Sequence, residues 1–250
     1  MHILLTNDDG ISAEGLYVLY GALQKIGRVT VVAPDSQRSS VSHAITLAHP
    51  IWQSKVKRNG KFFGYGISGT PADCVKFGVS VVLKRKPDVI VSGINLGPND
   101  GCSVFYSGTV AGAREGALMG IPSIAISLDT FVNPDFSYAA KCGAKFVRLI
   151  RKTRLPERTF LSINVPHLPE AKISGTRVTR QGLEPIHEQF VRRQDPNYRE
   201  YYWMTGRMPR VRKNTDFDTH ALKHGYVTVT PIRCDVTDHE FKQTLQALLN

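Results

Sequence analysis

A short apolar strand that ends in two carboxylates constrains the fold of this chain more than any other feature. The run Ile3–Leu5 is continuously apolar, as in strands that are buried on both faces of a parallel sheet. Directly after this strand come Asn7, Asp8, Asp9 and Gly10. Open α/β sheets bind their ligands at the carboxyl ends of such strands. The sequence therefore predicts a ligand site at this end of the first strand.

The residues after this strand predict a β-α-β unit. Ser12 is a candidate N-cap, and apolar residues then recur at helical spacing until Gly27 ends the helix. The apolar run Val29–Ala33 predicts the second strand. Further strands are expected at 88–92, 123–127 and 159–165, and further helices at 72–83, at 138–152 and up to Met119. This alternation favours an α/β fold with a mostly parallel sheet in a domain of 250 residues.

The adjacent carboxylates fit a cation site, and they also fit two simpler roles. Asp8 and Asp9 repel each other when both are ionised, so a site that keeps both charges needs a compensating cation. Hard divalent ions such as Mg²⁺ and Mn²⁺ prefer oxygen ligands. The simpler roles are that both residues are solvated loop acids, or that one of them caps the following helix.

Two other predicted strands also end in oxygen-bearing side chains. The serine-rich loop 34–43 leaves the second strand, which lies beside the first, although most such loops have no further role. Asn95 follows the strand predicted at 88–92 and offers an amide oxygen that suits a hard cation. Asparagine is otherwise common in turns. Both segments can reach the edge of the sheet that carries Asp8 and Asp9.

A glycine between two hydroxyl residues starts another predicted helix. Either Ser107 or Thr109 can cap a helix of small residues that runs to Met119. With Gly108, they begin a helix whose free backbone N–H groups and positive dipole end suit a phosphate. The alternative is an ordinary N-cap with close helix packing.

The segment 52–67 predicts a β-hairpin and argues against a dinucleotide site. Asn59-Gly60 lies between two strand-like runs, as in many hairpin turns. Gly64, Gly66 and Gly69 match the spacing of the dinucleotide fingerprint. They follow a hairpin strand, however, and not the first strand of a β-α-β unit. We therefore do not expect a dinucleotide to bind here.

The composition favours an anionic partner and a reducing compartment. The formal net charge is +11 and the pI is about 9.6, with arginine and lysine concentrated in residues 172–213. Nucleic acid and a phosphate-ester substrate both fit this charge. The four cysteines are widely separated and lack C-x-x-C spacing, which favours free thiols. Without a signal peptide or an apolar span, a cytoplasmic location is expected.

Residues 171–218 differ in character from the rest of the chain. They are polar and arginine-rich, with aromatic residues in Tyr198–Trp203 and no helical period. We expect β-hairpin arms that project from the core and favour oligomerisation over a nucleic-acid surface or a plain surface hairpin. After the arms, residues 226–231 predict a strand and residues 236–249 a helix.

The chain resembles the SurE family of stationary-phase survival proteins in motifs spread over almost its whole length. The motifs are Leu5–Gly10, Ala33–Ser39, Ser68–Val75, Ser92–Asn99, Tyr106–Val110, Ser162–Pro166, Thr215-Asp216 and Gly225–Pro231. They are densest in roughly the first 130 residues. Because they occur in order, together they are far more specific than any single motif.

The resemblance implies a metal-dependent 5′/3′-nucleotidase with a Rossmann-like three-layer core. It implies one domain over residues 1–250, with the core in 1–166, hairpin arms in 167–225, and a strand and helix that return to the core in 226–250. Family members release phosphate from nucleoside 5′- and 3′-monophosphates, with some activity on short polyphosphate. They form homodimers or homotetramers that exchange C-terminal elements.

Position by position, the resemblance also implies the site residues. One divalent ion per subunit, Mg²⁺ or Mn²⁺, is held by Asp8, Asp9, Ser39 and Asn95. Ser107–Thr109 corresponds to the family's phosphate-side loop, and Asn95 is expected to donate to phosphate as well. Asp8, Asp9 and Asn95 are then the catalytic residues.

The residues and the resemblance together predict phosphomonoester hydrolysis by an attacking water. Asp8 is favoured slightly over Asp9 as its base, and His43 is left out because a single histidine in a polar loop is more often incidental. One rival is an aspartyl-phosphate phosphatase, but that chemistry usually shows Asp-x-Asp after the first strand. The other is a basic RNA-binding module without catalysis, which has no need of oxygen ligands at strand ends.

Overall fold

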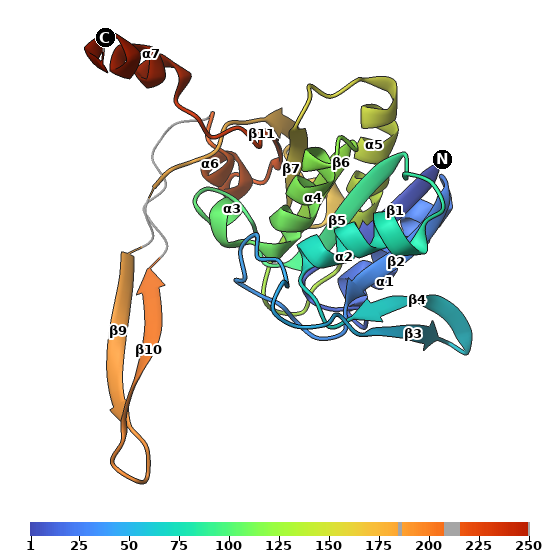
Figure 1. Ribbon diagram of the computed structural model, residues 1–250, viewed down its shortest axis with the longest axis horizontal. Coiled ribbons are helices and arrows are strands. Elements are labelled where there is room, and N and C mark those ends of the chain that lie inside the picture. Colours follow the sequence, from blue (N-terminus) through green and yellow to red (C-terminus); the bar gives the residue numbers. More distant parts are fainter. Residues whose placement is uncertain (185–186, 208–215, 250) are drawn as a thin grey trace.

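The fold is an open nine-stranded sheet with helices on both faces, from which a two-stranded hairpin projects (Figure 1). The computed structural model describes residues 1–184, 187–207 and 216–249. The motif residue Thr215 and the end of the arginine-rich segment, residues 208–213, therefore lie outside the described residues.

The strand order of the main sheet is β3-β4-β2-β1-β5-β6-β7-β11-β8. The strands are β1 (His2–Thr6), β2 (Arg28–Pro34), β3 (Gln53–Arg58), β4 (Lys61–Ile67), β5 (Val89–Leu96), β6 (Ser123–Asp129), β7 (Thr159–Pro166), β8 (Thr176–Val178) and β11 (Val227–Arg233). All neighbours from β4 to β7 are parallel, whereas β3 and β11 run antiparallel to β4 and β7. The prediction of a mostly parallel sheet is confirmed, and β1 lies centrally, between β2 and β5.

Helices cover both faces of this sheet and make the predicted three-layer sandwich (Figure 1). One face carries α1 (Glu14–Gln24) and α5 (Ser137–Lys152), and the other carries α2 (Pro71–Phe77) and α4 (Gly108–Leu118). Further helices are α3 (Ser103–Tyr106), α6 (Asp218–Lys223) and α7 (His239–Leu249). Among the described residues, no helix combines the length and the apolar character that crossing a membrane requires.

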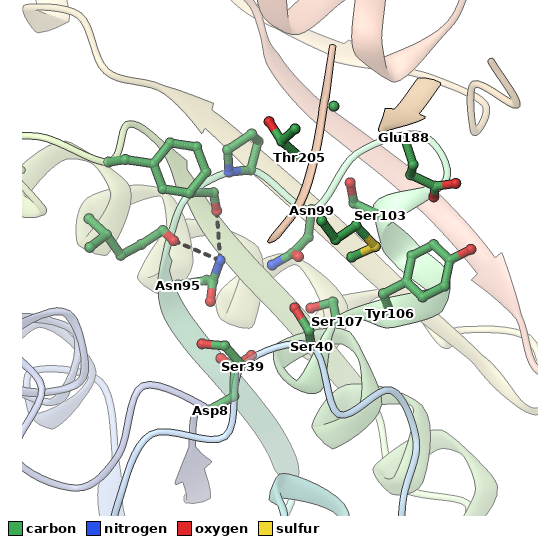
Figure 2. Close-up of a pocket in the computed structure, with 16 residues that line it drawn as sticks. Asp8, Ser39, Ser40, Asn95, Asn99, Ser103, Tyr106, Ser107, Glu188 and Thr205 are labelled. Carbon is green, nitrogen blue, oxygen red and sulfur yellow. Dashed lines mark hydrogen bonds between the residues drawn. The ribbon is translucent and has the colours of Figure 1, made fainter. Parts of the chain in front are cut away.

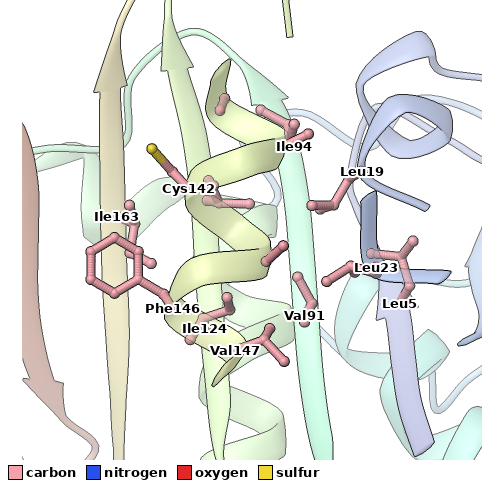
Figure 3. Close-up of a cluster of buried hydrophobic side chains, with 14 of the residues drawn as sticks. Leu5, Leu19, Leu23, Val91, Ile94, Ile124, Cys142, Phe146, Val147 and Ile163 are labelled. Carbon is pink, nitrogen blue, oxygen red and sulfur yellow. The ribbon is translucent and has the colours of Figure 1, made fainter. Parts of the chain in front are cut away.

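The apolar run of β1 supplies both layers of the core. Because side chains alternate along a strand, Ile3 and Leu5 pack with α1 and α5, whereas Leu4 packs on the α2 side. Figure 3 shows the first of these clusters, in which Leu19 and Leu23 of α1 lie over the sheet. These five side chains are 0% exposed, which agrees with a strand buried on both faces.

Two local predictions need correction. Ser12 is not the N-cap of α1, because the helix begins at Glu14 after Ala13, whose side chain makes no capping bond. A backbone hydrogen bond from Ala13 N to Gly10 O, 3.0 Å long, closes the preceding turn instead. The helix predicted at 72–83 is α2 followed by a π-helical turn, Gly78–Val82.

The β3–β4 hairpin is confirmed, and its turn explains the Asn-Gly pair. Asn59 and Gly60 have φ values of 50° and 74°, the left-handed region that a two-residue hairpin turn of this type requires. A second hairpin, β9 (His187–Gln194) and β10 (Glu200–Arg207), projects from the body as a predicted arm (Figure 1).

The final helix lies away from the core in the single chain, and the expectation that residues 226–250 return to a core stays a prediction for this helix. β11 pairs with β7 as a core strand, but no residue of α7 is buried and the helix points away from the body (Figure 1). Both faces of the sheet are already covered by α1, α5, α2 and α4. The apolar side of α7 therefore finds no surface within the described part of the chain.

Candidate functional site

The site lies at the carboxyl ends of β1 and β5, where the sequence predicted a ligand. Thr109 Oγ1, at the start of α4, donates a hydrogen bond to Asp8 Oδ1. The backbone N–H of Leu96, at the end of β5, donates to Asp9 Oδ2 at 3.1 Å. Each carboxylate is thus held by a different neighbouring element, and both belong to the turn that leaves β1.

Asn95 presents its amide oxygen to this group. Its Nδ2 donates to Gly97 O at 2.7 Å and to Leu96 O at 3.2 Å, so both amide hydrogens are used. Its Oδ1 therefore turns toward Thr109 Oγ1, 3.3 Å away. The position agrees with a cation ligand. It disagrees with the expectation that Asn95 donates to phosphate, because its NH₂ has no free hydrogen.

The start of α4 packs directly against Asp8. Ser107, and not Thr109, is the N-cap, since its Oγ accepts from Val110 N at 3.1 Å. A Cβ added to Gly108 would lie 2.8 Å from Asp8 Cβ and 3.2 Å from the backbone oxygen of Arg38. Only glycine therefore allows the helix to approach the carboxylate this closely.

Contacts within the protein already occupy two of the three backbone N–H groups that were expected to bind phosphate. The backbone N–H of Ser107 already donates to Ser103 O at 3.1 Å. The backbone N–H of Thr109 bonds to Asp8, and this lowers the pKa of that carboxyl group. Of the three N–H groups expected to hold phosphate, the described contacts leave that of Gly108 for a ligand.

The serine-rich loop reaches the same place. Arg38 N donates to Asp8 O at 2.7 Å, and Ser42 N donates to Tyr106 O at 2.9 Å. The loop is thus tied to β1 on one side and to α3 on the other. Ser39 lies between these ties, is exposed, and accepts only a bond from Gln37 Nε2 at 2.8 Å within the described structure.

These groups open into a pocket of about 640 Å³ (Figure 2). Asp8, Ser39, Asn95 and Ser107 line it, whereas Asp9 does not. The pocket is also lined by Pro98, Asn99, Ser103, Tyr106 and Phe131, and by Glu188, Met204, Thr205 and Gly206 from the arm. The volume is in the range of small-molecule sites and exceeds what a phosphate alone requires.

Burial makes the carboxylates weaker acids than usual. It raises the pKa of Asp8 to about 6; the hydrogen bonds from Thr109 oppose the rise, and the charge of Asp9 adds to it. Burial also raises the pKa of Asp9, against the Leu96 N–H bond. Neither residue has an ion-pair partner among the described side chains. A bound cation would supply the missing positive charge.

Three further parts of the chain differ in their relation to the pocket: His43, Asn99, and Phe131 with the arm. A hydrogen bond of 2.8 Å joins His43 Nε2 and Glu115 Oε2, and His43 does not line the pocket. Asn99 is buried and bonds through Nδ2 to Ser127 Oγ at 2.8 Å, which ties the pocket loop to β6. Sequence reasoning missed Phe131 and the arm as pocket residues, because no local pattern brings them to this edge.

An open α/β sheet with an oxygen-lined pocket at its carboxyl edge defines a ligand-binding α/β protein of the Rossmann-like class. The family model described as "Survival protein SurE" matches residues 3–188. This chain belongs to the SurE family.

Similar proteins support membership of the SurE family over almost the whole chain. Proteins named "5′-nucleotidase SurE" from Chlorobium luteolum and Thermosipho melanesiensis are each 46% identical; each alignment covers 98% of this chain, and 94% and 96% of theirs. The crystal structure of "Sure Protein" from Aquifex aeolicus superimposes with a TM-score of 0.87 at 38% identity, covering 100% of both chains.

Proposed function

We propose that this chain is a phosphatase of nucleoside monophosphates, a phosphoric monoester hydrolase of the 5′-nucleotidase type. The observation that carries the proposal is the pocket in which buried Asp8 meets Asn95, Ser39 and the start of α4. Relatives named 5′-nucleotidase, 46% identical over nearly the whole chain, support the substrate class. Both 5′- and 3′-monophosphates are proposed as substrates, with short polyphosphate as a lesser one.

The donor set fits one hard divalent cation per subunit, Mg²⁺ or Mn²⁺. Asp8, Asp9, Ser39 and Asn95 would hold it through carboxylate, hydroxyl and amide oxygens, which such ions prefer. When bound, the cation offsets negative charge on the phosphate and lowers the pKa of water. Two observations favour this fit: the carboxylates have no ion-pair partner among the described side chains, and the Asn95 Oδ1 turns toward Thr109 beside Asp8.

The chain's own groups would position the reactants. Asp8, held by Thr109, accepts a hydrogen bond from the attacking water and takes its proton as the water oxygen bonds to phosphorus. The P–O bond to the nucleoside breaks, and the leaving oxygen ends as a hydroxyl after taking up a proton. The Gly108 N–H and the positive end of α4 stabilise the phosphate oxygens.

The assembly and location belong to the same proposal. The exposed apolar side chains of α7, Phe241, Leu245 and Leu248, favour a homodimer or homotetramer in which C-terminal elements are exchanged. A cytoplasmic location remains a prediction from the sequence.

The direct test is phosphate release from nucleoside 5′- and 3′-monophosphates, after metal removal and after Mg²⁺ or Mn²⁺ is restored. We expect turnover to require the metal and Asp9→Asn to lower kcat by roughly a hundredfold or more. Glu157→Gln is the matched control, because Glu157 is an exposed acid before β7, at the opposite edge of the sheet.

Two outcomes would contradict the proposal. Absence of turnover with any metal and any nucleotide would remove the nucleotidase function. A steep salt dependence of RNA affinity in that case would support the RNA-binding alternative. Trapping a covalent phosphoaspartate would instead replace the attacking water with a carboxylate nucleophile.

A further inference from the structure

The pocket has an aromatic wall that the phosphate chemistry does not use. Phe131 lines the same pocket as Asp8 and Asn95, yet its side chain is 74% exposed. A ring exposed to this degree is ordinary when it is isolated on a surface, but this ring borders a pocket with an acidic floor. We therefore expect the ring to contact a flat apolar group of a ligand whose other end binds at the acidic floor of the pocket.

The ring lies beside the segment that carries Asn95. A Cβ added to Gly97 would approach Phe131 Cε1 to 2.3 Å, so the ring rests against the bare backbone two residues beyond Asn95. Gly97 has φ of +101°, which itself favours glycine. Gly97 N donates to Leu128 O at 3.0 Å, which ties this segment to β6, the strand that leads into Phe131.

The turn that presents the ring is held by its own hydrogen bonds. Thr130 N donates to Leu128 O at 2.8 Å, and Thr130 Oγ1 donates to Val132 O at 2.9 Å. Val132 N donates back to Thr130 Oγ1 at 3.2 Å. Phe131 is therefore presented by a pinned turn, which reduces the entropy lost when a ligand packs on it.

We propose that Phe131 forms a nucleobase subsite, in which its ring stacks on the base of a nucleoside monophosphate whose phosphate lies at Asp8 and Asn95. The inference rests on the proposed function and adds the group that recognises the base. Stacking on an aromatic side chain tolerates every base, because each base has a π-face. The subsite therefore selects nucleotides over other phosphate esters and favours the larger purine bases.

The test compares a nucleotide with the same molecule without its base. For the wild type and Phe131→Ala, KM is measured for AMP, and ribose 5-phosphate is measured as a competitor of AMP turnover. Competition reports its affinity whether or not it is hydrolysed. We expect Phe131→Ala to raise KM for AMP roughly tenfold, the scale of one lost base-stacking contact, and to leave the competition constant of ribose 5-phosphate unchanged.

Two further variants serve as controls. Phe131→Tyr retains the ring and is expected to retain the wild-type KM for AMP. Tyr106→Ala removes another exposed ring, 56% exposed, from the lining of the same pocket and is expected to have the smaller effect. Because Phe131 is exposed, its truncation removes little buried area, and an unchanged Tm confirms that each variant folds.

Three results would overturn the subsite. They are an equal weakening of AMP and ribose 5-phosphate, no weakening of either, or a loss for AMP that follows Tyr106→Ala and not Phe131→Ala. Any of these leaves nucleotidase activity itself intact in the wild type. Failure of the wild type to hydrolyse any nucleoside monophosphate would instead contradict the proposed function, so the two failures are distinguishable.

Discussion

The carboxyl edge of the sheet and the C-terminal elements use apolar residues in opposite ways. Beneath the site, Leu5 and Ile94 are 0% exposed and support the turn that carries Asp8. In β10 and α7, Trp203, Met204 and Leu248 are 63%, 66% and 75% exposed. Burial of apolar area stabilises a fold by about 25 cal/mol per Å².

This difference in burial distinguishes the body, whose apolar surface is covered within one chain, from the arm and α7, whose apolar surface is not. The sheet and its four covering helices bury their own apolar faces, so they position the site residues within one chain. The arm and α7 leave large apolar side chains exposed, which is typical of surfaces that bind other molecules. The pocket connects both regions, since Met204 and Thr205 of the arm line it with Asp8.

Truncation of one leucine in each region is expected to have the largest effect. Leu19→Ala, in the fully buried cluster under α1, is expected to lower the free energy of unfolding by about 2–5 kcal/mol. Leu248→Ala is expected to leave unfolding nearly unchanged and to shift assembly toward smaller species. Urea denaturation and light scattering on dilute samples measure the two effects. Equal losses of stability would show that α7 belongs to the core.

Two glycines of the body are expected to respond differently to substitution by alanine. Gly108→Ala places a methyl group against Asp8 and the Arg38 backbone, so we expect roughly a tenfold or larger fall in kcat and a lower Tm. Gly21→Ala is the matched control, because Gly21 is exposed on α1 with nothing within 4 Å of the added Cβ. It is expected to stabilise the protein by about 0.5–1 kcal/mol without changing turnover. A Gly108→Ala enzyme with full activity would contradict the close packing of α4 on Asp8.

The smallest expected effect concerns Asp100, which lies where the pocket loop meets the base of the arm. Burial raises the pKa of Asp100 to about 7, with contributions from Asp218, Asp129 and Glu184. Because the folded pKa exceeds the ordinary value of 3.8, the stability that Asp100 contributes is fully present below that value and is lost as pH rises through about 7. Asp100→Asn should therefore raise Tm by a few degrees near pH 8 and have less effect near pH 5. Thermal melts of the wild type and Asp100→Asn across this pH range measure the effect. A parallel loss of stability in both proteins as the pH rises would contradict the assignment.

Local sequence patterns predicted the helices, strands and turns because the interactions that determine them are short-range. The apolar run Ile3–Leu5, the helical spacing of Leu16, Leu19 and Leu23, and the turn Asn59-Gly60 each depend on neighbours a few residues away. The same logic brought Asp8 and Asn95 to one edge, since parallel strands end together. Ser12 failed as a cap because the turn from Gly10 to Ala13, closed by a backbone hydrogen bond, makes Glu14 the first residue of the helix.

The sheet, its covering helices and the oxygen-bearing residues at the strand ends therefore follow from local sequence patterns. Contacts between distant segments set how those groups are used: Thr109 holds Asp8 across 101 residues, and Leu96 holds Asp9 across 87. They also turned the Asn95 amide, brought Phe131 to the pocket and left α7 without a partner in the described part of the chain. These contacts depend on β1 lying between β2 and β5 and on which faces are already covered. No short-range pattern carries that information, because it arises from chain segments that meet only after the sheet has formed.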